Sequence, residues 1–243
     1  MTRVEKKEAQ ILSISQHLEK LTLTAQTAKS RGIQGRVKLF PMHMSRGVGI
    51  EEGYHNIFLN SRPGQRADGS GCDSLLAKSL GPVDHGQPGL PVCQNLQNFH
   101  EGNKYYAGED EKEFCSTRYA FYSDPVGRRH KFGGNEVPLY SVWIDKKGVE
   151  HQVDSVTSRQ FYCAFYERYA RQQPAYLELV EMLKKGMNLR ICSPDAEPFE
   201  SLDDVEKAYL DAKQPFGPAR ILCVMFTIPK EKYPWVKFKT FEF

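Results

Sequence analysis

The stretch SRQFYCAFYERYARQQPAYLELVEMLKKG, residues 158–186, carries the clearest helical pattern in the chain. Aromatic side chains in its first half recur at the three- and four-residue spacing of one helix face, which is more typical of a buried core than of a platform for stacking bases. Pro174 begins a second helix with a regular apolar stripe. Lys184, Lys185 and Gly186 end that helix with a cationic last turn and a C-cap. We therefore expect a hairpin of two helices.

Two further segments of regular structure are expected after this hairpin. Ser201 and Asp204 form an acidic variant of the capping signal, which predicts a third helix starting here. The run ILCVMFTI, residues 221–228, is almost entirely apolar and is expected to be buried. Its β-branched residues favour a strand, although its periodicity also allows a buried helix.

Residues 4–29 have the pattern of one long helix. Ile11, Ile14, Leu18 and Leu21 form a narrow apolar seam between polar side chains. The seam lasts for only two heptads, which favours a helix packed on the body of the protein. A helix that forms a homodimer is the alternative.

Short strands and loops are expected between residues 35 and 91. Alternating apolar residues within residues 35–58 indicate short strands separated by turns. The segments SRPGQRADGSGCD, residues 61–73, and GPVDHGQPGLP, residues 81–91, have little to bury, and the short apolar element LLAKSL lies between them. We expect surface loops, which serve either as flexible connections or as walls of a site.

Length, charge and hydropathy restrict the class of protein. A chain of 243 residues with 40% hydrophobic content can bury a substantial core, in one large domain or two small ones. A net charge of +3 is too small to indicate nucleic-acid binding through the whole surface, although a local basic patch remains compatible with it. The N-terminus MTRVEKKEAQ lacks the apolar part of a signal peptide, and no run of 18 apolar residues occurs. We expect a cytoplasmic (intracellular) protein without a membrane span.

The cysteines and histidines argue against a metal centre. Six cysteines are widely spread without a Cys-x-x-Cys pair, and seven histidines show neither a His-x-x-x-His nor an HExxH pattern. Thiols stay reduced inside cells, which argues against disulfides. We therefore expect no metal and no cofactor.

The segment NLQNFHEGNKYY, residues 95–106, is polar on more than one side. We interpret residues 95–106 as a helix, on which Gln97, Glu101 and Lys104 share one face because their spacings are four and three. That face either lines a pocket or forms a ladder of polar side chains on the surface.

This segment resembles the signature helix of the NADAR (YbiA-like) family, which reads roughly E-H-Y-x-Q-A-x-K-F. The corresponding residues here run from Gln97 to Tyr105, and Lys104 and the aromatic residues are the firmest matches. YLELVEMLKKGMNLRICSPDAEPF resembles a later helix followed by a glycine and a Ser-Pro-x-Asp-like turn, and FGPARILCVM resembles the ending G-x-N-x-L-G-x-x-L-M. The resemblance covers about residues 70–228.

The resemblance implies an α+β, mainly α-helical fold. The expected organisation is a single NADAR-like domain with short strands at residues 35–243, preceded by a helical extension at residues 1–34. The resemblance also implies N-glycosidase chemistry, because NADAR proteins cleave the bond between a ribosyl C1′ and a nitrogen. Their substrates are riboflavin-pathway intermediates or guanine that carries ADP-ribose.

Cleavage of such a bond passes through an oxocarbenium-like sugar. It needs a carboxylate that stabilises the cation or activates water, and a donor for the departing nitrogen. Glu101 and Asp195 are the candidate carboxylates, and His100 or Lys104 is the candidate donor. In full, we expect catalytic roles for Glu101, Asp195 and His100, and substrate-binding roles for Gln97, Asn98, Phe99, Lys104, Arg128 and Arg129.

The two arginines belong to FYSDPVGRRHKFGGN, residues 121–135, the strongest local basic cluster. An Asp-Pro turn precedes them and two glycines follow, so a loop is expected here, on which the arginines either contact phosphates or are solvated. Arg159 is expected to make a structural ion pair or to contact backbone carbonyls.

One departure from the family pattern bears on catalysis. Gln97 stands where the signature has glutamate, and an amide cannot act as a base. Either Glu101 supplies the charge for hydrolysis of a ribosylated or ADP-ribosylated base, free or in nucleic acid, or the protein binds nucleotide or nucleic acid without hydrolysis. A third reading is an interaction protein, in which the N-terminal helix forms a homodimer and the basic loop meets a polyanion.

Overall fold

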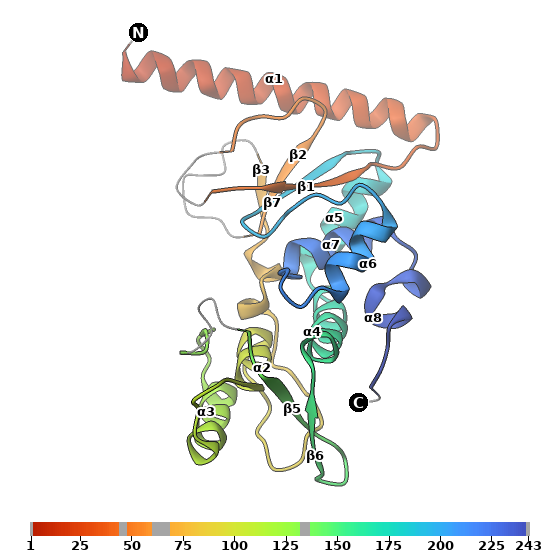
Figure 1. Ribbon diagram of the computed structural model, residues 1–243. Coiled ribbons are helices and arrows are strands. Elements are labelled where there is room, and N and C mark those ends of the chain that lie inside the picture. The colour runs from red at the N-terminus through yellow and green to blue at the C-terminus, as the bar shows by residue number, and fades with distance from the viewer. Residues whose placement is uncertain (1, 44–47, 60–68, 132–136, 242–243) are drawn as a thin grey trace.

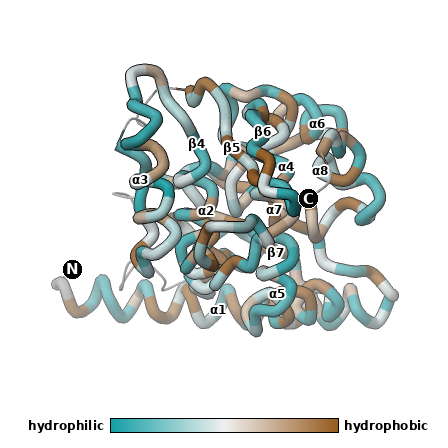
Figure 2. The backbone as a smooth tube through the Cα atoms, turned by 90° about the horizontal axis from the view of Figure 1, so that it is seen from below, coloured by the Kyte–Doolittle hydropathy of each residue, from teal (hydrophilic) through white to brown (hydrophobic). Residues whose placement is uncertain are grey.

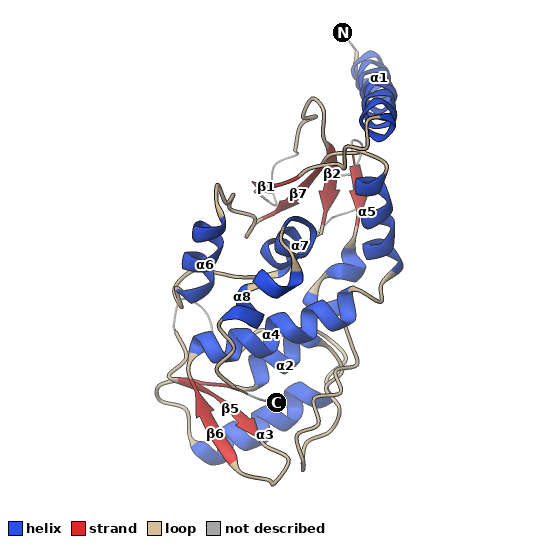
Figure 3. Ribbon diagram, turned by 90° about the vertical axis from the view of Figure 1, so that its right-hand side faces the viewer, coloured by secondary structure: helices blue, strands red, loops and turns tan. Residues whose placement is uncertain are grey.

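The computed structural model describes residues 2–43, 48–59, 69–131 and 137–241, which form a mixed α/β fold. Two small sheets lie at opposite ends of the body, and several helices pack between them (Figures 1 and 3). The expected combination of many helices with short strands is therefore present.

The first sheet has four parallel strands in the order β1-β7-β2-β3. These strands are β1 (Val37–Pro41), β2 (His55–Phe58), β3 (Gly69–Gly71) and β7 (Leu189–Ser193). Strands β1 and β2 confirm the strands predicted within residues 35–58. Because the strands are parallel, their carboxyl ends meet at one edge, where open parallel sheets commonly bind ligands.

Strand β3 corrects part of a sequence prediction. It lies within residues 61–73, which the sequence predicts as a loop, and residues 61–68 are outside the described part of the chain. Gly69 packs so closely on the backbone of Asn56 in β2 that a side chain at position 69 would overlap it. Glycine therefore allows a strand here, although its usual association is with turns.

The second sheet is antiparallel and has the order β4-β5-β6. Its strands are β4 (Lys104–Tyr105), β5 (Tyr140–Ile144) and β6 (Glu150–Val153). Trp143 of β5 packs on Phe161, with the ring centres 4.6 Å apart. Helices α2 (Leu96–Gly102) and α3 (Glu111–Ser123) contact each other beside this sheet.

The helices of the C-terminal half largely confirm the sequence predictions. They are α4 (Ser155–Ala170), α5 (Pro174–Lys184), α6 (Leu202–Leu210), α7 (Pro218–Thr227) and the short α8 (Pro234–Lys237). The aromatic residues of α4 are buried, as expected, and the Ser201 hydroxyl accepts the Asp204 N–H at the start of α6. Single 3-10 turns occur at Asp73–Leu75, Ala77–Ser79 and Lys230–Lys232.

The run at residues 221–228 is helical, which corrects the preference for a strand. Pro218 occupies the first turn of α7, where its missing N–H has no cost. Ile221, Leu222 and Val224 are all completely buried, so apolar residues surround the helix and no polar face marks its period. Burial on all sides therefore removed the signal that distinguishes a helix from a strand.

Helix α1 (Arg3–Ser30) confirms the long N-terminal helix and packs on the body through its C-terminal half. Leu21 and Ala25 are buried there, and His17 Nε2 lies 3.1 Å from the Tyr54 carbonyl oxygen. Ile11 of the predicted seam is exposed, because the N-terminal part of α1 extends past the rest of the chain (Figures 1 and 2). No described helix is both long enough and apolar enough to cross a membrane.

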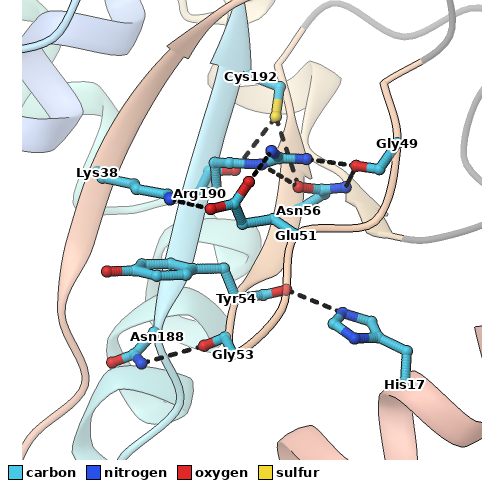
Figure 4. Close-up of polar contacts among 10 residues, drawn as sticks. All are labelled: His17, Lys38, Gly49, Glu51, Gly53, Tyr54, Asn56, Asn188, Arg190 and Cys192. Carbon is cyan, nitrogen blue, oxygen red and sulfur yellow. Dashed lines mark hydrogen bonds and ion pairs between the residues drawn. The ribbon is translucent and has the colours of Figure 1, made fainter.

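A buried arginine joins three strands of the parallel sheet to the segment before β2 (Figure 4). Arg190 of β7 donates to Asn56 Oδ1 at 2.6 Å, to Glu51 Oε2 at 2.9 Å and to the Gly49 carbonyl. Glu51 also pairs with Lys38 of β1. Because the Arg190 side chain is only 3% exposed, these acceptors replace its lost hydration.

Replacing Arg190 by methionine should destabilise the protein. The variant keeps much of the side-chain volume but removes the charge-assisted hydrogen bonds, each of which contributes about 1.5–3 kcal/mol. We expect the free energy of unfolding in urea to fall by at least that amount. Lys184→Ala, which breaks only an exposed ion pair with Glu181, is the control and should change stability little. Equal stability of Arg190→Met and the wild type would contradict a supporting role of this network.

Candidate functional site

Helix α2 is shorter than the sequence predicts. It begins after Asn95, whose side chain accepts the Asn98 N–H, and ends at Gly102. The Asn103 side chain donates to the Phe99 carbonyl at 2.7 Å and so occupies an acceptor at the helix end. Lys104 lies on β4 and not on the helix, which corrects the prediction of one helix over the whole segment.

A cavity of about 1140 Å³ opens beside α2. It lies between the carboxyl end of β7, the first turns of α4 and α7, and strand β5. The remaining walls come from the turn at Leu76–Lys78, from Gly127 and Arg129, and from residues 212–216.

Six of the predicted site residues line this cavity: Gln97, His100, Glu101, Lys104, Arg129 and Asp195. Asn98, Phe99 and Arg128 do not belong to its lining. Asn98 is fully buried and bonded to backbone, while Phe99 packs in the core with its ring 5.1 Å from that of Phe165. Arg128 is exposed and pairs with Asp124.

Glu101 and Lys104 form a partly buried ion pair on the cavity wall. Lys104 Nζ lies 2.8 Å from Glu101 Oε1, and the two side chains are 16% and 14% exposed. Glu101 Oε2 accepts the backbone N–H of His130 at 3.1 Å. Both carboxylate oxygens of Glu101 are therefore engaged.

Asp195 differs from Glu101 because one of its carboxylate oxygens has no bonded donor among the described residues. The Ser193 hydroxyl donates to Oδ1. Oδ2 lies against Gly217, the N-cap of α7. A carboxylate at this position is favoured because the N-terminus of a helix attracts negative charge.

His100 and Tyr162 adjoin each other on the cavity wall, with ring centres 4.6 Å apart. Burial, followed by the charges of Lys104 and Arg159, holds the pKa of His100 well below its ordinary value. Burial, followed by the charge of Asp195, raises the pKa of Tyr162 well above its ordinary value. Near neutral pH the site therefore contains a neutral imidazole and a protonated phenol.

Several lining residues were not predicted from the sequence. Ser155, Ser158 and Tyr162 lie on one face of α4, at the spacing i, i+3, i+7, and face the cavity together with Arg159. The spacing is visible in the sequence, but nothing in it shows which face of α4 meets a cavity. Ser141 of β5, the strand partner of Lys104, also lines the cavity.

Arg159 confirms the expected contact with backbone carbonyls. Its guanidinium donates to the carbonyls of Ala208, Tyr209, Asp211 and Gln214. These acceptors lie at the end of α6 and in the segment after it, which forms one wall of the cavity. Arg159 therefore holds that wall in place.

The charges of the cavity are arranged by depth. Lys78, Arg129 and Lys213 are exposed residues of the lining, and no described acidic side chain pairs with any of them. The carboxylates of Glu101 and Asp195 belong to partly buried residues of the same lining. An anionic group of a ligand would therefore be attracted to the exposed cations, and a positive charge on the ligand to the partly buried carboxylates.

Comparisons of the chain with known protein families, with curated proteins and with solved structures give no match. Among the described residues, no group of three or more His, Cys, Asp or Glu side chains is placed to hold a metal ion. What the protein does must therefore be argued from the geometry and charge of the site.

Gly217→Ala should disturb the position of Asp195. The backbone angle φ of Gly217 is −94°, which alanine tolerates, but the added Cβ would overlap Asp195 Oδ2. Because the overlapped atom is the end of a side chain that can turn away, we expect a loss at the lower end of the about 1–3 kcal/mol of overpacked sites, measured by urea unfolding. Gly49→Ala, whose Cβ meets nothing within 4 Å, is the matched control. The close packing is refuted if both variants unfold alike.

His100 should make the protein less stable in mild acid. Its pKa is lowered in the folded state, so below its ordinary value of 6.5 the unfolded chain binds a proton that the folded chain excludes. Stability is therefore retained above pH 6.5 and falls below it, by at most about 1.4 kcal/mol per pH unit. Unfolding measured between pH 7 and pH 5 should show a smaller loss for His100→Gln than for the wild type. Identical losses would mean that His100 protonates freely.

Proposed function

We propose that the protein is an N-glycosidase-type hydrolase that acts on a ribosylated or ADP-ribosylated base or nucleotide. The observation that carries this proposal is the meeting, in one cavity, of the Asp195 carboxylate, a neutral imidazole and three exposed cations. The volume of about 1140 Å³ is slightly larger than the about 300–1,000 Å³ of ordinary ligand pockets, which leaves room for a nucleotide-sized molecule. The sequence resemblance to the NADAR family supports the same chemistry.

Asp195 is the carboxylate that we assign to the developing positive charge. In an N-glycosidic cleavage the sugar becomes oxocarbenium-like, and a carboxylate beside it stabilises that charge or takes a proton from the attacking water. Asp195 Oδ2 is available for this task because only Oδ1 is bonded among the described residues. Ser193 fixes the orientation of the carboxylate.

The departing nitrogen needs a donor on the opposite side of the sugar. The lowered pKa of His100 leaves its imidazole neutral, so it donates an N–H hydrogen bond but holds no extra proton near neutral pH. Tyr162 stays protonated because its pKa is raised, and its hydroxyl is a second donor. We propose that these neighbouring side chains contact the leaving base.

Phosphate groups of the substrate would be recognised at the cavity mouth. Lys78, Arg129 and Lys213 come from three different segments of the lining, and we propose that they contact the anionic part of the substrate. Lys104 is less exposed than these three cations and pairs with Glu101 on the cavity wall. This arrangement fits a ribosyl phosphate or an ADP-ribosyl group.

The alternative function is binding of a nucleotide or nucleic acid without hydrolysis. It is favoured by Gln97, whose side chain donates to the Arg128 carbonyl at 3.0 Å. Gln97 therefore supports the backbone of the loop that contains Arg128. A residue engaged in this way is not a catalytic base. Binding without turnover would then be a property of the intact wild-type cavity.

The proposed function is tested by incubating the wild type with ribosylated bases, ribosylated nucleotides and ADP-ribosylated DNA. Mass spectrometry should detect a released base, and Asp195→Asn should slow its release by about 10²–10⁴-fold. Lys104→Ala should weaken substrate binding by about 1.5–3 kcal/mol without unfolding the protein. Lys184→Ala, at a residue outside the lining, is the control for both.

The outcomes separate the two functions. Release of a base by the wild type but not by Asp195→Asn supports hydrolysis. Binding without release, together with activity gained in Gln97→Glu, supports the binding module and contradicts the hydrolase. If the wild type neither binds nor cleaves any member of the panel, both are wrong.

A further inference from the structure

The backbone of residues 124–130, called the wall segment below, is held by side chains of α2. Asn98 Nδ2 donates to the carbonyls of Asp124 and Val126 at 2.8 and 2.9 Å, and Asn98 Oδ1 accepts the Arg128 N–H at 2.8 Å. Gln97 Nε2 donates to the Arg128 carbonyl at 3.0 Å. Polar atoms of α2 thus replace the partners that a sheet or helix would give this backbone.

Glu101 continues the same row one turn later. Its Oε2 accepts the His130 N–H at 3.1 Å, while Oε1 faces Lys104. Gln97 and Glu101 are four residues apart, so they lie on the same side of α2, with Asn98 beside them. The wall segment therefore lies along α2 and is bonded at several successive points.

Two further contacts restrict the wall segment. The His130 ring is stacked between Tyr106 and Phe121, with centres 4.8 and 5.7 Å away, and its Nε2 lies 3.2 Å from Glu109 Oε1. At the other side, Gly127 lies so close to Lys78 that a side chain at position 127 would overlap it. Arg129 lies between these two contacts and lines the cavity.

We propose that Gln97, Asn98 and Glu101 are positioning residues that hold the wall segment, and with it the charge of Arg129, at the cavity mouth. Glu101 acts through its acceptor oxygen on the His130 N–H and is not the carboxylate of the reaction. The part that concerns ligands rests on the proposed function, because it takes Arg129 as a contact for the anionic part of the substrate. The part that concerns the wall segment depends only on hydrogen bonds within the protein.

Two replacements of Glu101 separate positioning from catalysis. Glu101→Ala removes the acceptor. Glu101→Gln removes the negative charge and the contact with Lys104, but its one amide oxygen can still accept the His130 N–H. Hydrogen exchange of residues 125–131, measured without ligand, should become about tenfold faster or more in Glu101→Ala, since a hydrogen bond to a charged group is lost. Glu101→Gln should keep exchange close to that of the wild type. Arg129→Ala, which removes no bond to α2, is the control and should exchange like the wild type.

Binding of ADP-ribose, followed by calorimetry, extends the test to the ligand. We expect Arg129→Ala and Glu101→Ala each to weaken binding by about tenfold or more, because both remove the cation from its place. Glu101→Gln should bind within about threefold of the wild type, because its amide oxygen still accepts the His130 N–H and leaves Arg129 in place.

The results distinguish failure of this inference from failure of the proposed function. Unchanged exchange in Glu101→Ala would overturn the positioning role, whatever the substrate is. Protected exchange in Glu101→Gln together with complete loss of turnover would also overturn it, because the charge of Glu101 would then serve the reaction. If the wild type cleaves nothing and the exchange pattern is as expected, the proposed hydrolase fails while the positioning of the wall segment stands.

Discussion

The burial of α4 between the two sheets is the constraint on which the other elements depend. One side of the helix packs in the core, where Phe161 meets Trp143 of β5 and Phe165 meets Phe99 of α2. Large aromatic side chains gain most of their stabilisation from such burial, so the position of α4 sets the distances of its neighbours. Another side carries Ser158 and Tyr162 and faces the cavity. A single helix therefore both organises the core and supplies the cavity floor.

Arg159 links this helix to the wall that contains residues 212–216. Burial lowers its pKa, but a guanidinium keeps its charge in proteins, so the charge needs acceptors. Carbonyls at the end of α6 provide them, and the C-terminus of a helix favours a positive charge. The segment fixed in this way leads to Gly217, which packs against Asp195. The position of the proposed reactive carboxylate thus depends on a buried arginine of another element.

The sequence predicts those elements whose signals are local. Pro174 and Gly186 mark the ends of α5, and Ser201 marks the start of α6, because proline, glycine and capping hydroxyls act within one turn of the chain. The end of α2 was not predictable in the same way. Gly102 allows close packing on Phe121, a residue 19 positions away, and only the fold brings the two together.

The candidate site also combines features that the sequence shows locally with contacts that only the fold creates. Residues 97–104 stand out in the sequence because polar side chains occur where a core face is expected, and four of the predicted site residues on this stretch do line the cavity. Their bonding partners were hidden, because Gln97 and Asn98 contact backbone about 30 residues away. Ser141 and Ser155 were missed since a lone serine carries no signal until a strand and a helix place it beside a cavity. Unusual polarity therefore pointed to residues that line the cavity, whereas their bonding partners became visible only in the fold.

The arrangement of charge by depth has a consequence for the proposed hydrolase. Exposed cations at the mouth are screened over about 8 Å at physiological salt, so they act mainly on anionic groups in direct contact. Asp195 is partly buried, where water screens less and its charge acts more strongly on a nearby cation. The same charge repels phosphate. In the proposed hydrolase, electrostatics would therefore favour one orientation of a substrate with a phosphate at one end and a ribosyl bond at the other, with the phosphate at Arg129 and Lys213 and the sugar beside Asp195.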